Sequence, residues 1–347
     1  RDRSQAISGE IRAAIVSEPE AADVPPPRIK PEAYETYLRG RHALNTWAWE
    51  SRVRARELFQ RAIELDPNFA PAWSALAFTI IAEEFGALDP ERDEVLGARA
   101  AALRALELDP DLGEAHAVVG FLALYSDWDW PVAERELKRA LELSPQDSNV
   151  RHGYADNLLV MGKLEASLEQ TRLGRSYDPL ARLPHQEVLY HALMAGHYDE
   201  VIAEGRRTLE KFPESTSPHG PIGDALWALG RYEEALAEYE VRWGPESDSF
   251  RVFSEGFERA GPKGASKALA DRLDERSKTE PINPVTIAGH YAWAEESDLA
   301  FEWLENAYDV HSAMLLHTPF DPYFGPILSD PRFAALMRRI GIPQFTE

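Results

Sequence analysis

Cysteine is absent from the 347-residue chain, which excludes disulfides, thiolate nucleophiles and cysteine-based zinc sites. No apolar run approaches the roughly 18 residues of a membrane-spanning helix, so we expect no membrane insertion. No signal peptide is visible and the chain begins with Arg1, so we expect it to be part of a longer protein. The sequence leaves the compartment open. We expect the cytoplasm, or an extracytoplasmic location if a membrane span precedes this chain.

Basic residues are in the minority: 37 Lys and Arg face 59 Asp and Glu, which gives a formal net charge of −22. A surface this acidic repels phosphate backbones and anionic lipid, so we expect no nucleic acid to bind through this chain. Hydrophobic residues make up 44% and charged residues 28%, which is typical of a folded protein and not of a disordered one.

Sequence motifs of catalysis are also missing. The chain contains no H-E-x-x-H, no G-x-S-x-G, no phosphate-binding loop and no G-x-G-x-x-G. We therefore expect no cofactor, no bound metal and no catalytic residue, and we expect that the chain is not an enzyme.

Internal repetition is abundant. One pattern occurs at residues 62–67 (AIELDP), 105–110 (ALELDP) and 140–145 (ALELSP), and Pro179 and Pro213 continue the series. The gaps between its prolines are 43, 35, 34 and 34 residues. A second series, spaced by 34 residues, consists of Gly162, Gly196 and Gly230. Two independent markers with one period predict a repeat protein.

One unit shows what each repeat contains. Apolar residues at helical spacing lead to Gly230, and glycine tolerates the left-handed conformation that closes a helix. A second stripe follows with the spacing i, i+3, i+4, i+7, which is one face of a helix: Tyr232, Ala235, Leu236 and Tyr239. In most units a proline then ends the pattern, because the residue before proline is biased away from helix. Each unit is thus expected to be a helical hairpin.

The period of 34 residues and the order of small, aromatic and proline positions resemble tetratricopeptide repeats. In the unit above, Gly223, Ala235 and Tyr239 occupy small, small and aromatic consensus positions. The resemblance implies an all-α, right-handed superhelical solenoid of about six to eight helical hairpins. One degenerate unit is expected at residues 249–280.

The ends of the chain predict three parts. Residues 1–16 are expected to form a short amphipathic helix, residues 17–31 a proline-rich linker, and residues 32–347 the repeat array. Asp330 and Pro331 have the pattern of a helix start, and Gly341 of a helix end. We expect this last helix to cap the array, because a terminal repeat cannot bury its outer face alone.

A narrower resemblance rests on three segments, at residues 33–41 (AYETYLRGR), 127–136 (DWDWPVAERE) and 329–333 (SDPRF). Together they resemble the C-terminal repeat region of large bacterial signalling proteins. In that group the repeats follow a serine/threonine kinase, a winged-helix DNA-binding domain or a nucleotide cyclase. This resemblance implies a sensory or regulatory module with a protein or peptide partner.

In tetratricopeptide proteins, the first helices of successive repeats line the concave surface. The consensus positions carried over onto this chain predict a binding groove of Phe78, Phe121, Tyr125, His152, Asp156, Tyr190, Asp224, Trp227 and Trp293. Rigid aromatic side chains with a few acids suit peptide recognition. The alternative for each residue is packing between neighbouring helices.

The family members that bind the acidic C-terminal tails of heat-shock chaperones carry Lys and Asn at two set groove positions. The matching pairs here offer no such cations; examples are Ser74 with Phe78 and His152 with Asp156. That class of partner is therefore not expected.

Two groups of polar residues contain the residue types of metal or catalytic sites. His185, His191 and His197 are each six residues apart, which places them about 120° apart on one helix, so they cannot converge on a metal from that helix. Asp127 and Asp129 could form a catalytic pair. We instead expect Asp129 to cap the following helix, with Trp128 or Trp130 packed between repeats.

A third group, around the insertion of the second repeat, is expected to be a solvated loop with an acidic first helical turn. It consists of Glu83, Glu84, Asp89, Glu91, Asp93 and Glu94.

The leading hypothesis is a protein-binding module of a bacterial signalling or transcription-regulating protein. Two alternatives stay open at this point. One is a hydrolase on a helical-repeat scaffold that uses Asp127 or Asp129. The other is an oligomerisation arm, whose exposed aromatic residues would pair with a second copy of the chain.

Overall fold

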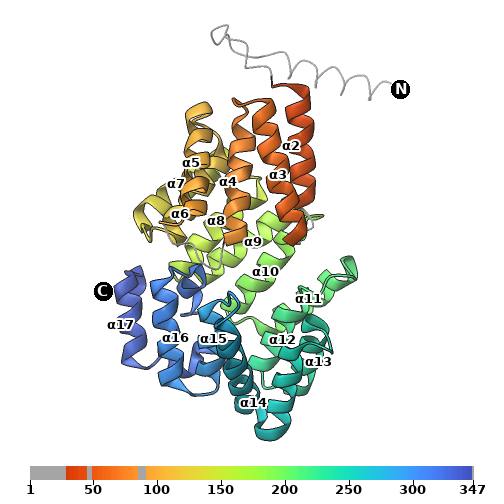
Figure 1. Ribbon diagram of the computed structural model, residues 1–347, viewed down its shortest axis with the longest axis vertical. Coiled ribbons are helices and arrows are strands. Elements are labelled where there is room, and N and C mark those ends of the chain that lie inside the picture. Colours follow the sequence, from red (N-terminus) through yellow and green to blue (C-terminus); the bar gives the residue numbers. More distant parts are fainter. Residues whose placement is uncertain (1–28, 45–48, 85–90, 346–347) are drawn as a thin grey trace, which may run out of the picture.

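The computed structural model describes residues 29–44, 49–84 and 91–345, and within these ranges every regular element is a helix (Figure 1). This confirms the expected all-α fold. The expected helix at residues 1–16 and the linker up to residue 28 lie outside the described residues.

Successive helices pair as antiparallel hairpins, as the 34-residue period predicts. The pairs are α2 (Pro31–Leu44) with α3 (Trp49–Leu65), α4 (Ala70–Glu84) with α5 (Asp93–Leu108), α6 (Gly113–Tyr125) with α7 (Trp130–Leu143), α8 (Ser148–Val160) with α9 (Leu164–Tyr177), α10 (Leu183–Met194) with α11 (Tyr198–Lys211), α12 (His219–Ala228) with α13 (Tyr232–Trp243), and α15 (Pro284–Trp293) with α16 (Ser297–Asp309). In Figure 1 the pairs follow one another from α2 at one end of the molecule to α12 and α13 near the other.

The degenerate repeat expected near residues 249–280 is α14 (Asp248–Ser277), which is broken in its middle. Ala260 and Gly261 have non-helical dihedral angles, and Gly261 has φ 66°. The two halves pack so tightly that a Cβ on Gly256 would lie 2.7 Å from the Gly264 carbonyl oxygen. α14 is therefore a helical hairpin with a very short turn.

Small residues allow the two helices of a hairpin to approach closely. A Cβ added to Gly223 on α12 would lie 2.5 Å from Cε1 of Tyr239 on α13, closer than carbon atoms pack. Gly40 on α2 has the same relationship to Phe59 on α3. The small-against-aromatic consensus is thus a packing requirement inside each hairpin.

The glycine series ends the first helix of each hairpin, as expected. Gly162, Gly196 and Gly230 have φ angles of 71°, 75° and 75° and follow α8, α10 and α12. This left-handed conformation costs glycine little, because it has no Cβ.

The C-terminal end has a helix at the expected place, α17 (Pro331–Ile340), and its role as the cap of the array stays a prediction. Asp330 caps it by accepting a hydrogen bond from the Arg332 backbone N–H, and Gly341 ends it with φ 80°. The buried stripe consists of Phe333, Leu336, Met337 and Ile340. α17 packs against α16.

The array curls so that its last hairpin reaches the turn between α6 and α7. Trp128 in that turn stacks on His311, which follows α16, with ring centroids 4.2 Å apart, and it also contacts Tyr308 of α16. Segments about half the chain apart are therefore held together, and the inner surface between them is partly enclosed.

Candidate functional site

The inner surface is built from the first helices of the hairpins. α4 contacts α6, α6 contacts α8, α8 contacts α10, and α10 contacts α12. Two short 3₁₀ helices after α16, η1 (Ala313–His317) and η2 (Pro322–Ile327), lie against these helices: η1 contacts α8 and η2 contacts α15. The chain's own C-terminal segment therefore covers part of the surface where the sequence analysis expects an open groove.

Hydrogen bonds hold this segment in place. The Tyr125 hydroxyl lies 2.8 Å from Nε2 of His317, and the Tyr190 hydroxyl lies 2.6 Å from Nδ1 of the same ring. In η2, the Tyr323 hydroxyl donates to Asp224 over 3.2 Å. These bonds join η1 to α6 and α10, and η2 to α12.

One cavity of about 260 Å³ lies between η1 and the helices α4, α6, α8 and α10. Its apolar lining includes Phe78, Ile81, Phe121 and Met314, and its polar lining includes Arg52, His152, Asp156 and Glu187. A mostly apolar wall with a few convergent charged groups is the usual character of a ligand pocket.

A second cavity, of about 420 Å³, lies on the C-terminal side of η1, between α10, α12, α13 and α15. Its lining includes Met194, Asp224, Trp243, Asp321 and Phe324. Tyr190 and Met314 line both cavities, so the two are adjacent.

Six of the nine predicted groove residues line these cavities. Four of them line the first cavity: Phe78, Phe121, His152 and Asp156. Tyr190 lines both, and Asp224 lines the second. The binding role of all six stays a prediction.

The other three predicted groove residues lie elsewhere. Trp227 is only 1% exposed, because it packs among the rings of Tyr232 and Phe253, so its assignment to the groove surface is wrong. Tyr125 is fully buried beneath η1. Trp293 packs against Tyr323 of η2.

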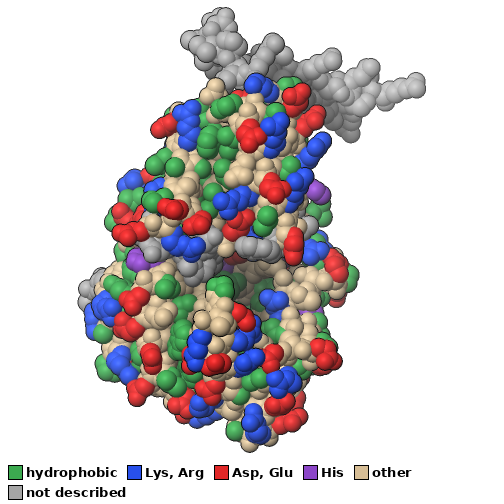
Figure 2. Space-filling view, in the orientation of Figure 1, with side chains coloured by type: hydrophobic (Ala, Val, Ile, Leu, Met, Phe, Trp, Pro, Cys, Tyr) green, Lys and Arg blue, Asp and Glu red, His purple; other side chains and the backbone are tan. Residues whose placement is uncertain are grey.

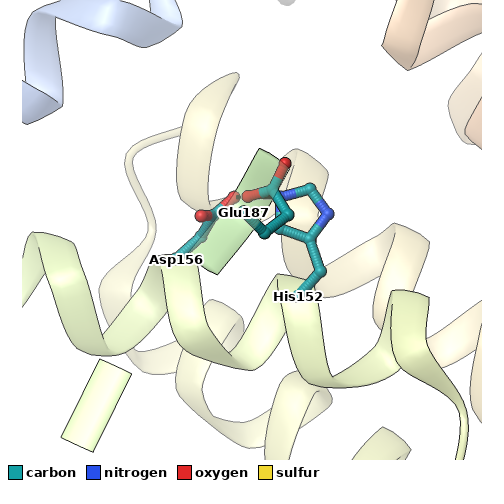
Figure 3. A group of neighbouring side chains, drawn as sticks. All are labelled: His152, Asp156 and Glu187. Carbon is teal, nitrogen blue, oxygen red and sulfur yellow. Dashed lines mark ion pairs between the residues drawn. The ribbon is translucent and has the colours of Figure 1, made fainter. Parts of the chain in front are cut away.

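Charged side chains meet at one wall of the first cavity. His152 and Asp156 lie one turn apart on α8, and Glu187 reaches them from α10 (Figure 3). The His152 Nε2 atom is 3.1 Å from Glu187 Oε2 and 3.3 Å from Asp156 Oδ2. From the other side, His191 Nε2 lies 3.2 Å from Asp156 Oδ1 and 3.6 Å from Glu187 Oε2. We call these four residues the α8–α10 cluster.

The charges in the α8–α10 cluster stabilise one another. Burial lowers the pKa of His152, but Glu187 and Asp156 outweigh it and raise that pKa well above 6.5. Burial likewise raises the pKa of Glu187, but the neighbouring histidines bring it down to about 2. Without another ligand, the cluster therefore consists of paired ions inside the protein.

The three histidines weighed as a metal site lie at three different places, as the helical geometry implies. His185 bonds the Pro179 carbonyl oxygen, His191 belongs to the α8–α10 cluster, and His197 pairs with Glu165 at the surface. The sequence analysis missed Glu187 and the meeting of His191 with Asp156. A signal was available: His152 with Asp156, and Glu187 with His191, are i,i+4 pairs on the first helices of successive repeats.

The acidic residues weighed as catalytic have structural contacts. Asp127 forms two hydrogen bonds with Arg99, of 2.7 and 2.9 Å. Asp129 caps α7 by accepting from the Val132 backbone N–H, and Trp128 packs on α16, as expected. Asp93 and Glu94 lie in the first turn of α5, as expected, whereas residues 85–90 of that loop lie outside the described residues. The expected solvated loop is wrong for Glu83, which lies in α4 and whose buried side chain forms an ion pair with Arg56 over 2.9 Å.

The hairpin geometry and the period define the class: the chain has the tetratricopeptide-repeat fold. No family model matches it. It is 27% identical over 144 residues to the transcriptional regulator HilA of Salmonella typhimurium, a match that covers 41% of this chain and 26% of the regulator. The chain thus matches only about a quarter of that protein's length.

Two solved structures are similar to this chain. A human IFIT1 dimer with m7Gppp-AAAA has a TM-score of 0.53 at 15% identity, covering 80% of this chain and 72% of that one. Yeast Tom70 has a TM-score of 0.47 at 16% identity, covering 96% and 75%. The IFIT1 likeness supports the fold. Among the described residues, no helix is both long and apolar enough to cross a bilayer.

Proposed function

We propose that this chain is a protein-binding scaffold that acts as the sensory or regulatory module of a bacterial signalling or transcription-regulating protein. Its inner surface, on both sides of η1, binds a segment of a partner protein. The chain has no catalytic activity in this proposal. The observation that carries it is the pair of adjacent cavities that share Tyr190 and Met314.

The cavities have the size and the lining of sites for anchoring side chains. Their volumes, about 260 and 420 Å³, exceed that of a large side chain, and aromatic and Met side chains contribute to both walls. Buried apolar pockets of this kind supply most of the affinity at protein interfaces. A peptide that crosses η1 could place one anchor in each cavity.

The charge of the chain suggests the charge of the partner. A net charge of −22 favours association with a basic segment and speeds its encounter at low salt. Figure 2 shows acidic and basic side chains interspersed on the face in view, so this attraction is spread over the surface and not gathered in one patch there. We therefore expect a partner segment with apolar anchors and a net positive charge.

The regulatory role rests on the likeness to HilA, a transcriptional regulator, and on the resemblance to repeat regions of bacterial signalling proteins. A solenoid suits this role because each repeat contacts only its neighbours, so small shifts add up to altered curvature. Whether two copies of the chain associate stays a prediction, which light scattering of the purified chain would test.

Panning of a phage-displayed library of random dodecapeptides over the purified chain tests the binding proposal. Enriched peptides are then titrated by fluorescence anisotropy against the wild type, Met314→Glu and Leu328→Glu. Met314 lines both cavities, so a charge there should weaken binding at least about tenfold. Leu328 belongs to the same C-terminal segment but is 41% exposed and lines neither cavity, so its variant should bind like the wild type. Absence of any enriched peptide, or equal weakening in both variants, would contradict the proposal.

The regulatory part needs the longer protein. Its output is compared with that of a version truncated near Pro25, with and without the stimulus. An unchanged response after truncation would reject the regulatory role while leaving peptide binding intact.

A further inference from the structure

The α8–α10 cluster has the geometry of a metal-binding site. One donor atom from each of His152, Asp156 and Glu187 lies within 4.8 Å of the other two, and the three side chains point toward one another (Figure 3). The donors come from two successive repeats, so the cluster spans the boundary between them.

The separations between the donor atoms also suit a shared ion. Charge-assisted N–H···O bonds are typically about 2.7–2.9 Å long. Ligand atoms about 2.1 Å from a first-row metal ion lie about 3.0 Å apart at neighbouring octahedral corners and about 3.4 Å apart at tetrahedral ones. The four nitrogen–oxygen distances here are 3.1, 3.2, 3.3 and 3.6 Å.

His191 supplies an independent observation. Ser167 Oγ donates its single proton to the Ala155 carbonyl oxygen, over 2.7 Å. It must therefore accept from His191 Nδ1, which lies 2.6 Å away and carries the ring proton. The Nε2 atom of His191 is buried, makes no hydrogen bond and faces the carboxylates of Asp156 and Glu187, 3.2 and 3.6 Å away. A cation is favourable at this place, and either a proton on Nε2 or a metal ion in its stead supplies it.

We propose that His152, Asp156 and Glu187 bind a divalent transition-metal ion, of the zinc or manganese class, with His191 as a neighbouring donor. The ion neutralises the two carboxylates and joins α8 to α10. This site goes beyond the proposed peptide binding, because it can exist whether or not a partner binds.

The donor set selects the class of ion. Imidazole nitrogen with carboxylate oxygen suits Zn²⁺, Mn²⁺ and Fe²⁺, whereas Ca²⁺ and Mg²⁺ prefer oxygen alone and Cu⁺ prefers sulfur. The ring of His191, the neighbouring donor, is also held from behind by Ser167 at its Nδ1 atom, as metal-binding histidines usually are.

The site also has an open side. All three ligands line the cavity of about 260 Å³, so an ion there has a route of entry and can keep a position for water or for a carboxylate of a bound partner. The ion would then lie at the floor of the proposed binding surface.

The test is isothermal titration calorimetry of the EDTA-treated full chain with ZnCl₂ and, separately, MnCl₂. We expect one equivalent of at least one ion to bind, and the melting temperature to rise in its presence. Glu187→Gln keeps the side-chain shape and should lower the affinity for the ion at least about tenfold. His152→Ala should lower this affinity further.

A surface pair provides the matched control. His197 lies 2.9 Å from Glu165 on the neighbouring helix, and this pair is far more exposed than the α8–α10 cluster. His197→Ala and Glu165→Gln should leave the affinity unchanged. Circular dichroism of each variant checks the fold, and the visible spectrum of Co²⁺ bound to the wild type reports directly on nitrogen and oxygen ligands.

The outcomes separate the possibilities. Stoichiometric binding that Glu187→Gln weakens and Glu165→Gln does not would support the site. Absence of stoichiometric binding to the wild type would overturn it. Binding that is lost in His197→Ala but retained in His152→Ala would overturn it as well. In those cases the cluster is an internal network of ion pairs, and the peptide-binding proposal is unaffected.

Discussion

Tyr190 on α10 and His317 in η1 are joined by a hydrogen bond of 2.6 Å although they lie 127 residues apart in the sequence. Burial lowers the pKa of His317 to about 4, so its ring is neutral and has one donor and one acceptor nitrogen. Burial raises the pKa of Tyr125, and the charge of Asp156 raises it further, so its hydroxyl stays protonated. The His317 ring therefore bridges two hydroxyl groups, one at each ring nitrogen, and ties η1 to α6 and α10.

Replacement of His317 by Leu should lower the free energy of unfolding by about 2–4 kcal/mol, because it removes a bridge between two buried hydroxyls. Urea unfolding followed by circular dichroism measures the change. Tyr190→Phe removes only one of the two bonds and should cost about 1 kcal/mol. Stability of the His317→Leu variant equal to that of the wild type would mean that η1 does not hold the inner surface together.

Glycine-to-alanine substitutions should have opposite effects at two helical positions. At Gly223 the new methyl group would lie 2.5 Å from the Tyr239 ring, so we expect a loss of about 1–3 kcal/mol. At Gly97, inside α5, nothing lies within 4 Å of the added Cβ, so alanine should gain about 0.5–1 kcal/mol from its helix propensity. Thermal unfolding of the two variants measures both changes. Equal shifts in one direction would contradict the packing account of the hairpins.

Trp227→Ala should cost about 3–5 kcal/mol, because it removes a fully buried indole from contact with Tyr232 and Phe253. The loss should be visible in urea unfolding in the absence of any partner. A stable Trp227→Ala variant that only loses peptide binding would restore Trp227 to the binding surface and contradict its buried position.

Stability should fall as pH rises from about 4 to about 7, in part because of Asp321. Burial, with a smaller contribution from the charge of Asp224, raises the pKa of Asp321 to about 7, although the hydrogen bond from the Tyr323 N–H lowers it. The unfolded chain loses this proton near pH 3.8, so between these values only the folded state holds it. The stabilisation is complete below the unfolded pKa and is lost as pH rises through 7.

Asp321→Asn resembles the protonated carboxyl and keeps an oxygen for the Tyr323 N–H, which now donates to Oδ1 over 2.9 Å. The variant should therefore lose less stability than the wild type over the same pH interval. Groups such as His152 titrate in both proteins, so their contribution cancels in the comparison. Identical pH profiles of the melting temperature would show that Asp321 is ionised throughout.

The hairpins could be predicted from the sequence because their signals are local. Gly230 closes α12, and Tyr239 packs on Gly223 within the same unit, so one repeat period contains the whole contact. The position of η1 could not be predicted in this way, since His317 bonds Tyr125 across 192 residues. No periodic pattern marks such a contact.

The residues of the groove could be assigned only in part. Consensus positions identify the helix to which a residue belongs, and on this basis Phe78 and His152 are expected on the inner surface, where both line the first cavity. They do not say how far a side chain lies from the inner surface, so Trp227, on the same row of helices, was assigned to the groove although it points into the core. Glu187 has no aromatic or consensus character and was passed over, and only its i,i+4 spacing from His191 indicates the cluster.

Hydrogen–deuterium exchange of the chain with and without a library-selected peptide tests the central claim most directly. If the partner segment binds the inner surface, slower exchange should appear in α8, α10 and residues 313–317, which surround the two cavities. The second helices α9, α11 and α13 should exchange as in the free chain. Protection confined to these second helices, with no change at α8, α10 and η1, would contradict the account.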